Sequence, residues 1–130
     1  PSNRIFSGCN KTSVVVDAST GKIVATIANG TRVDALGWDS AKKLVFIPNG
    51  GEGNVTVAHQ DSADKYTPVG NVTTQFGTRT MTIDPKTFSV SGVVLNISTP
   101  GTLHKSLHVV PHLAHQGADL TGARHPVVAF

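Results

Sequence analysis

Histidines crowd the C-terminal part of this 130-residue chain, and His104, His108 and His112 follow one another at intervals of four residues. On an α-helix this spacing places the three side chains in one stripe, where two histidines can share a zinc ion. The segment therefore predicts a divalent-metal site, and we expect no other cofactor. The alternative is an unusual composition without a ligand, because Pro111 would interrupt the helix.

Two arginines occupy matching places in a segment that occurs twice. Gly30-Thr31-Arg32 and Gly77-Thr78-Arg79 each lead into a short β-like stretch that ends in an acidic turn. Cations at equivalent positions of a repeat can hold an anionic ligand. Asp34 is close enough in sequence to neutralise Arg32. We name Arg32, Asp34 and Arg79 as ligand-binding candidates, with turn-bracing side chains as the plainer interpretation.

His59 lies near Asp61 and Asp64 in a polar segment, and we add it to the ligand-binding candidates. A solvated loop without a ligand is the alternative for this cluster. The sequence contains neither a G-x-S-x-G nucleophile elbow nor a G-x-x-x-x-G-K-[ST] phosphate loop. No catalytic residue can therefore be assigned.

The composition narrows the class of protein. Hydrophobic residues make up 38% of the chain and charged residues 15%, which fits a soluble globular domain with a core. The net charge is +3, but the chain has no run of Lys or Arg and few aromatic residues. Nucleic acid is therefore a poor candidate partner. No apolar stretch approaches the roughly 20 residues of a membrane-spanning helix, so we expect no membrane partner.

The elements that would position these side chains are short strands separated by turns rich in Gly, Asn and Pro. Alternating or β-branched runs predict strands over residues 4–9, 13–17, 22–28, 33–38, 44–47, 54–58, 66–72, 79–83 and 88–95. Repetition with a period of about 45 residues and several strands per period is typical of β-propeller blades. We predict an all-β chain, a partial β-propeller of four-stranded antiparallel blades.

The repeat also predicts which strand is which within each blade. The first blade lacks its innermost strand a and contains b-c-d, the second is a complete a-b-c-d, and the third is partial. In this alignment Ile5-Phe6 corresponds to Val45-Phe46, and residues 14–16 correspond to residues 55–57. Strand a lines the central channel of a propeller, so Arg32 and Arg79 are expected at the channel mouth. Trp38, in strand a, is expected in the core.

Residues 4–88 resemble the YVTN-repeat propellers, the family of YncE-like bacterial proteins. The resemblance rests on Arg4-Ile5-Phe6, on the hairpin of residues 13–27 with its Asp17-x-x-Thr20-Gly21-Lys22 turn, and on residues 79–87 as the entry to a further blade. It implies an exported, periplasmic or secreted protein that acts as a binding or scaffold module. Some relatives are lactonases or electron-transfer modules.

We divide the chain into propeller blades over residues 1–98 and a divergent, His-rich tail over residues 99–130. The composition of the tail also resembles a coding sequence read in a shifted frame. Two to three blades leave exposed flanks, which favour association, so we predict a homo-oligomer that completes the ring.

The expected function is a ligand- or partner-binding propeller module without its own catalytic centre. It would take a small molecule or a protein at the channel mouth. The alternative is a hydrolase, lactonase- or esterase-like, with a His- or metal-based site formed in the oligomer.

Overall fold

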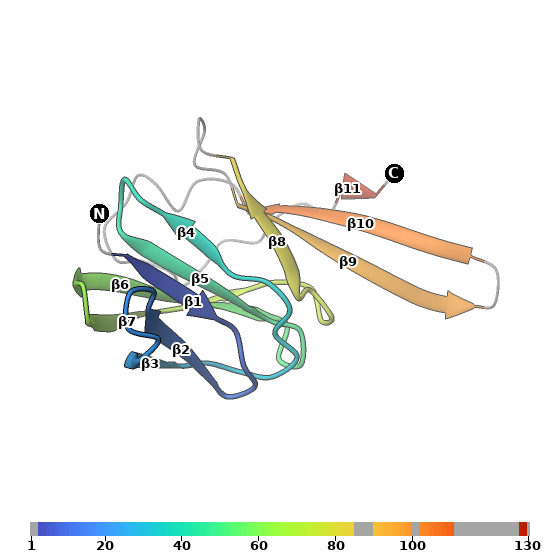
Figure 1. Cartoon of the computed structure of the whole chain (residues 1–130). Helices are drawn as coiled ribbons and strands as arrows, with labels where there is room; N and C mark the ends of the chain where they lie inside the picture. The colour runs from blue at the N-terminus through green and yellow to red at the C-terminus, as the bar shows by residue number, and fades with distance from the viewer. Residues whose placement is uncertain (1–2, 85–89, 100–101, 111–127, 130) are drawn as a thin grey trace.

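The structure is a computed structural model that describes residues 3–84, 90–99, 102–110 and 128–129, with side chains described for 3–84 and Val90. Within these residues the regular elements are strands, which form three antiparallel sheets (Figure 1). This confirms the all-β prediction. None of the described segments forms a helix long and apolar enough to cross a membrane.

The first sheet has three strands in the order β1-β2-β3, namely β1 (Arg4–Ser7), β2 (Thr12–Asp17) and β3 (Ile23–Ala28). The turn between β2 and β3 is closed by Asp17, whose Oδ1 accepts hydrogen bonds from the backbone N–H groups of Ser19 and Thr20. Gly21 follows with φ 69°, a left-handed conformation that glycine adopts without strain. The sheet contains the predicted b-c-d strands.

The second sheet has the order β4-β5-β6-β7, which is the predicted a-b-c-d blade. Its strands are β4 (Gly37–Asp39), β5 (Leu44–Asn49), β6 (Asn54–Ser62) and β7 (Lys65–Thr73). Strand a is shorter than the predicted span of residues 33–38. Val33 and Leu36 instead pack as a loop against the core cluster, so their apolar character reflects burial rather than strand pairing.

The third sheet consists of β8 (Thr80–Ile83), β9 (Val90–Thr99), β10 (Thr102–Val110) and β11 (Val128–Ala129), with β8 and β11 at its edges. β9 and β10 form a long hairpin that extends away from the other two sheets (Figure 1). The sheet therefore continues past residue 98 into the segment that we set apart as a tail, where the sequence showed no blade pattern.

The middle sheet is buried on both faces. Val45, Ile47 and Ala58 pack with Val15 and Ile27 of the first sheet. The opposite face carries a second cluster, made of Phe46, Val55, Val57 and Val90. Side chains alternate between the two faces of a strand, so consecutive residues of β5 serve different neighbours. Sheets stacked face to face in chain order are the arrangement of consecutive propeller blades.

The strand register corrects the sequence alignment of the first two blades by one residue. Phe6 is opposite Val15, and Phe46 is opposite Val57. Val15 is therefore the equivalent of Val57, not of Thr56 as the alignment of residues 14–16 with 55–57 had it. A shift of one residue transfers every side chain to the other face of the sheet.

Candidate functional site

The two Gly-Thr-Arg segments lie on either side of the turn between β5 and β6. The N–H of Gly50 in this turn donates to the carbonyl of Arg32 at 3.3 Å, and the carbonyl of Gly50 accepts from the N–H of Gly77 at 2.9 Å. A Cβ atom on Gly50 would lie 3.0 Å from the Cβ of Arg79 and 3.2 Å from the carbonyl oxygen of Arg32. The structure thus brings Arg32 and Arg79 to one end of the middle sheet.

Among the described residues, one ion pair lies at this end of the middle sheet, between Arg79 and Asp34. Arg79 Nε lies 2.9 Å from Asp34 Oδ2, and both side chains are roughly half exposed. Asp34 was expected to neutralise Arg32, and this was wrong. The N–H of Ala35 donates to the carbonyl of Arg79 at 3.2 Å, which fixes Asp34 beside Arg79. No ion pair of the described residues engages the exposed Arg32.

A buried asparagine holds the first of these segments in place. Asn49 is 1% exposed. Its Oδ1 accepts from the N–H of Gly30 at 2.8 Å, and its Nδ2 donates to Asn54 Oδ1 at 2.7 Å and Thr56 Oγ1 at 2.8 Å. The Glu52 carboxylate accepts from the backbone and hydroxyl of the residue after Gly30, at 2.7 and 2.9 Å. Sequence reasoning missed both supports, because Asn49 and Glu52 look like ordinary turn residues.

His59 is not part of this arrangement. It pairs with Leu44, the first residue of β5, whereas the Gly-Thr-Arg segments contact the turn after the last residue of that strand. Six residues of strand separate the two places by roughly 20 Å. His59 Nδ1 lies 2.9 Å from Asp61 Oδ1, and Asp61 Oδ2 accepts from Thr67 Oγ1 at 2.5 Å. The hydrogen bonds from Thr67 and His59 lower the pKa of Asp61 below its ordinary value.

Two histidines of the tail, His104 and His108, lie on a strand and not on a helix. His104 and His108 are on β10, opposite Asn96 and Gly92 of β9. Four residues of strand span about 13 Å, so the helical spacing behind the shared metal site is wrong for this pair. His112 lies outside the described residues. The side chains that are described contain no group of three potential metal ligands, and the metal site stays a prediction.

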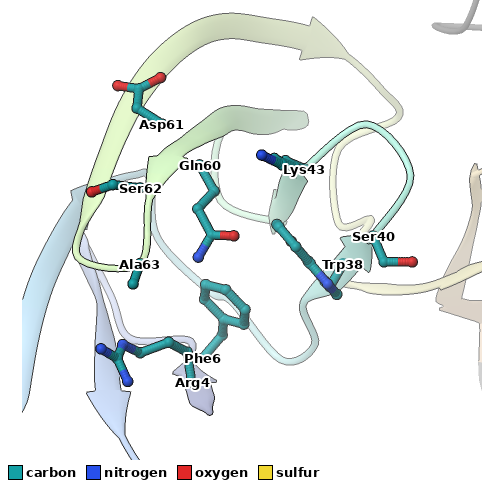
Figure 2. A pocket seen from close by; sticks show the side chains of 9 residues that line it. All are labelled: Arg4, Phe6, Trp38, Ser40, Lys43, Gln60, Asp61, Ser62 and Ala63. Atoms are coloured by element: carbon teal, nitrogen blue, oxygen red, sulfur yellow. The ribbon is translucent and has the colours of Figure 1, made fainter. Parts of the chain in front are cut away.

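A cavity of about 500 Å³ lies between the first two sheets. Figure 2 shows Phe6 and Trp38 on one side of it, with Gln60 and Lys43 above them and Arg4 below. The rings of Phe6 and Trp38 stack with centroids 5.5 Å apart. Trp38 is nevertheless 36% exposed, so the expectation that it belongs to the core was wrong.

The charge of Arg4 in this cavity is already compensated. Its guanidinium lies 2.7 Å from Asp17 Oδ2 and 2.7 Å from Asp64 Oδ1. The pKa of Asp17 is lowered, chiefly by the hydrogen bond from the N–H of Ser19. Asp64 is thereby drawn away from the His59 cluster in which the sequence had placed it. Lys43 also lines the cavity, and no ion pair of the described residues involves its side chain.

No protein-family model and no curated protein matches this sequence. Among solved structures, the crystal structure of the tricorn protease is similar, at 18% sequence identity and a TM-score of 0.47. The similarity covers 82% of this chain and 10% of that chain, so the present chain spans a small part of its length. The likeness is too weak to carry an argument, and the assignment of propeller-like blades rests on the stacked sheets described above.

Proposed function

We propose that the chain is a β-propeller segment that binds an anionic ligand or partner at the end where its two Gly-Thr-Arg segments meet. The observation that carries the proposal is the placement of Arg32 and Arg79 on either side of Gly50. These arginines precede the innermost strands β4 and β8, which pack side by side. Loops that precede innermost strands lie at the mouth of a propeller channel, where ligands reach them from solvent.

The charges at this end favour a small multivalent anion. Asp34 compensates Arg79, while the guanidinium of Arg32 is left to solvent, and each Arg can form bidentate hydrogen bonds with carboxylate or phosphate oxygens. The hydrogen bonds of Asn49 and Glu52 fix the backbone that carries Arg32. A fixed backbone reduces the ordering that a ligand would otherwise have to impose.

Citrate is a suitable probe, measured by isothermal titration calorimetry at low salt. We expect Arg32→Gln to weaken citrate binding about tenfold, because a charge-assisted hydrogen bond contributes about 1.5 kcal/mol or more. Asp34→Asn should tighten binding, since it frees Arg79. Lys22→Gln removes the same charge from the opposite end of the first sheet and is the matched control. Equal losses in Arg32→Gln and Lys22→Gln would refute a specific site.

A hydrolase of the lactonase or esterase kind is the second candidate, and the contact between His59 and Asp61 favours it. A carboxylate that orients a histidine is one half of a nucleophile-activating arrangement. The hydrogen bonds of the described residues give His59 no hydroxyl partner at its other nitrogen. A hydrolase at this position would therefore need its nucleophile from a second subunit or from a substrate-bound water. Hydrolysis of a lactone or an aryl ester that survives His59→Gln would eliminate this version.

We further propose membership of the YVTN-repeat propellers, export to the periplasm or beyond the cell, and a homo-oligomeric state. The first sheet supports the oligomer, because Ile5 and Ile23 on it are 54% and 62% exposed. Such apolar flanks favour association. Light scattering at micromolar concentration tests it: we expect a mass above the monomer that falls in an Ile5→Lys/Ile23→Lys variant. A well-folded monomer would overturn the proposal.

A further inference from the structure

The face of the middle sheet that packs on the first sheet changes from apolar to polar toward the turn between β5 and β6. Three cross-strand pairs follow one another on this face, namely Val45–Ala58, Ile47–Thr56 and Asn49–Asn54. Their apolar members belong to the core between the two sheets. Their polar members line a second cavity, of about 430 Å³. This volume lies within the range of small-molecule sites.

This second cavity lies where β3 of the first sheet runs beside β7 of the second (Figure 1). Ala28 lines it from β3, and Pro68, Gly70 and Asn71 line it from β7. β7 carries one extra residue between Pro68 and Gly70, a bulge of the kind that often adjoins binding sites. The free edge of the first sheet is β1, at the opposite side of that sheet from β3. The strands that bound the cavity are therefore all described.

The backbone determines which atoms of the lining side chains are left for a ligand. The N–H of Gly30 can only donate, so the Asn49 atom that receives it is Oδ1. Asn49 Nδ2 then donates to Asn54 Oδ1 and to Thr56 Oγ1. Asn54 Nδ2 and the hydroxyl hydrogen of Thr56 remain, and the hydrogen bonds of the described residues give neither of them an acceptor. Thr56 is 6% exposed, so a molecule inside the cavity is the natural acceptor for its hydroxyl.

Glu52 supplies the acceptors of the cavity. Each of its carboxylate oxygens accepts one hydrogen bond from Thr31 and keeps a further lone pair. An anionic ligand would be repelled by this carboxylate. A bare cation would find few ligands, because the side-chain oxygens of Asn29, Asn49 and Asn54 already accept hydrogen bonds within the chain. The cavity therefore suits a neutral molecule that both accepts and donates hydrogen bonds.

We propose that this cavity binds a neutral saccharide of one or two rings. A sugar hydroxyl both accepts and donates, so one can accept from Asn54 or Thr56 while its neighbour on the ring donates to Glu52. Asn71, exposed on β7, adds a donor and an acceptor at the rim. The lining has no large apolar side chain, which a peptide or an aromatic ligand would use as its anchor. The site is separate from the arginine site and does not depend on it.

Two-dimensional ¹H–¹⁵N NMR of the whole chain follows this site directly, because the side-chain NH₂ groups of Asn54 and Asn71 give their own signals. The probes are the methyl glycosides of glucose, galactose and mannose, and the disaccharide cellobiose. We expect at least one of them to shift both NH₂ signals saturably, with a Kd of roughly 1 mM. Tetrahydropyran-2-methanol keeps the ring but has a single hydroxyl group, and it should leave both signals unchanged.

Two exposed lining residues offer variants that leave the fold intact. Asn71→Ala removes the polar group at the rim and should weaken sugar binding about fivefold. Ala28→Leu fills part of the cavity and should weaken binding tenfold or more. Thr26→Leu is its matched control, because Thr26 is exposed on the same face of β3 but does not line the cavity. Its affinity for the sugar should be unchanged.

Several results would overturn the proposal. One is the absence of a saturable shift with all four sugars, and another is equal sugar affinity in Ala28→Leu and Thr26→Leu. A saturable shift of the Asn54 signal with calcium chloride or citrate, but with no sugar, would assign the cavity to an ion instead. The Arg32→Gln variant should bind the sugar as the unaltered protein does, so failure of the anion site and failure of this cavity are separable.

Discussion

Replacing Asn49 by alanine should destabilise the chain more than its polar character suggests. The Asn49 side chain takes part in three hydrogen bonds, with the N–H of Gly30, Asn54 Oδ1 and Thr56 Oγ1, and is 1% exposed. A buried hydrogen bond contributes about 1 kcal/mol net, and partners left without one cost further. We expect Asn49→Ala to lower the free energy of unfolding by about 3 kcal/mol.

Urea unfolding followed by circular dichroism measures this effect. With a denaturant dependence of about 2 kcal/mol per molar urea, a loss of 3 kcal/mol lowers the midpoint by about 1.5 M. Asn71→Ala is the matched control, because Asn71 is exposed on β7, and should change stability by less than about 0.5 kcal/mol. A loss below about 1 kcal/mol in Asn49→Ala would show that this network does not hold the Gly-Thr-Arg segment, and the argument for a fixed arginine site would fail.

Three further predictions test the turns, the core and the charges. Lys43 has φ 55°, so Lys43→Gly should raise the free energy of unfolding by about 0.5–1 kcal/mol in thermal unfolding, whereas Lys43→Ala should give no gain. Ile47→Ala should cost about 2–5 kcal/mol in urea and Ile23→Ala less than about 0.5, because Ile47 is fully buried and Ile23 exposed. The pKa of Asp61 is lowered in the folded state, chiefly by the hydrogen bond from Thr67. The ionised carboxylate therefore adds to the free energy of unfolding above about pH 4, and this stabilisation is lost as the pH falls through the lowered pKa. Thr67→Val should therefore reduce the change in urea midpoint between pH 5 and pH 2, and an unchanged acid dependence would contradict this.

Strands and turns over residues 4–84 could be predicted because local signals and tertiary packing agree there. Alternating apolar residues gave β3 and β6, and the Asp17 turn has the backbone conformation that its Thr-Gly sequence favours. The predicted span of strand a in the second blade was wrong for a physical reason. Val33 and Leu36 are apolar because a loop presses them onto the core beside Gly8, where a Cβ atom would lie 2.5 Å from Leu36 Cδ1. Periodicity cannot tell a buried loop from a strand.

The candidate site was predictable only in part. The repeat identified Arg32 and Arg79, and the structure brings both to the Gly50 turn. Which of them Asp34 would pair with depended on a backbone hydrogen bond between Ala35 and Arg79, which nothing in the local sequence specifies. His59 was grouped with them on chemistry alone, although it lies at the other end of the middle sheet.

Two equivalent residues of the first and second sheets differ in exposure for one physical reason. Ile5 and Val45 occupy equivalent positions, each beside a phenylalanine that faces the next sheet, yet Ile5 is 54% exposed and Val45 is fully buried. The residue types are both β-branched and apolar, so the difference comes from the neighbour: Val45 has the first sheet against it. The apolar pattern of a strand thus records the surfaces that it is suited to contact, whether or not they are present.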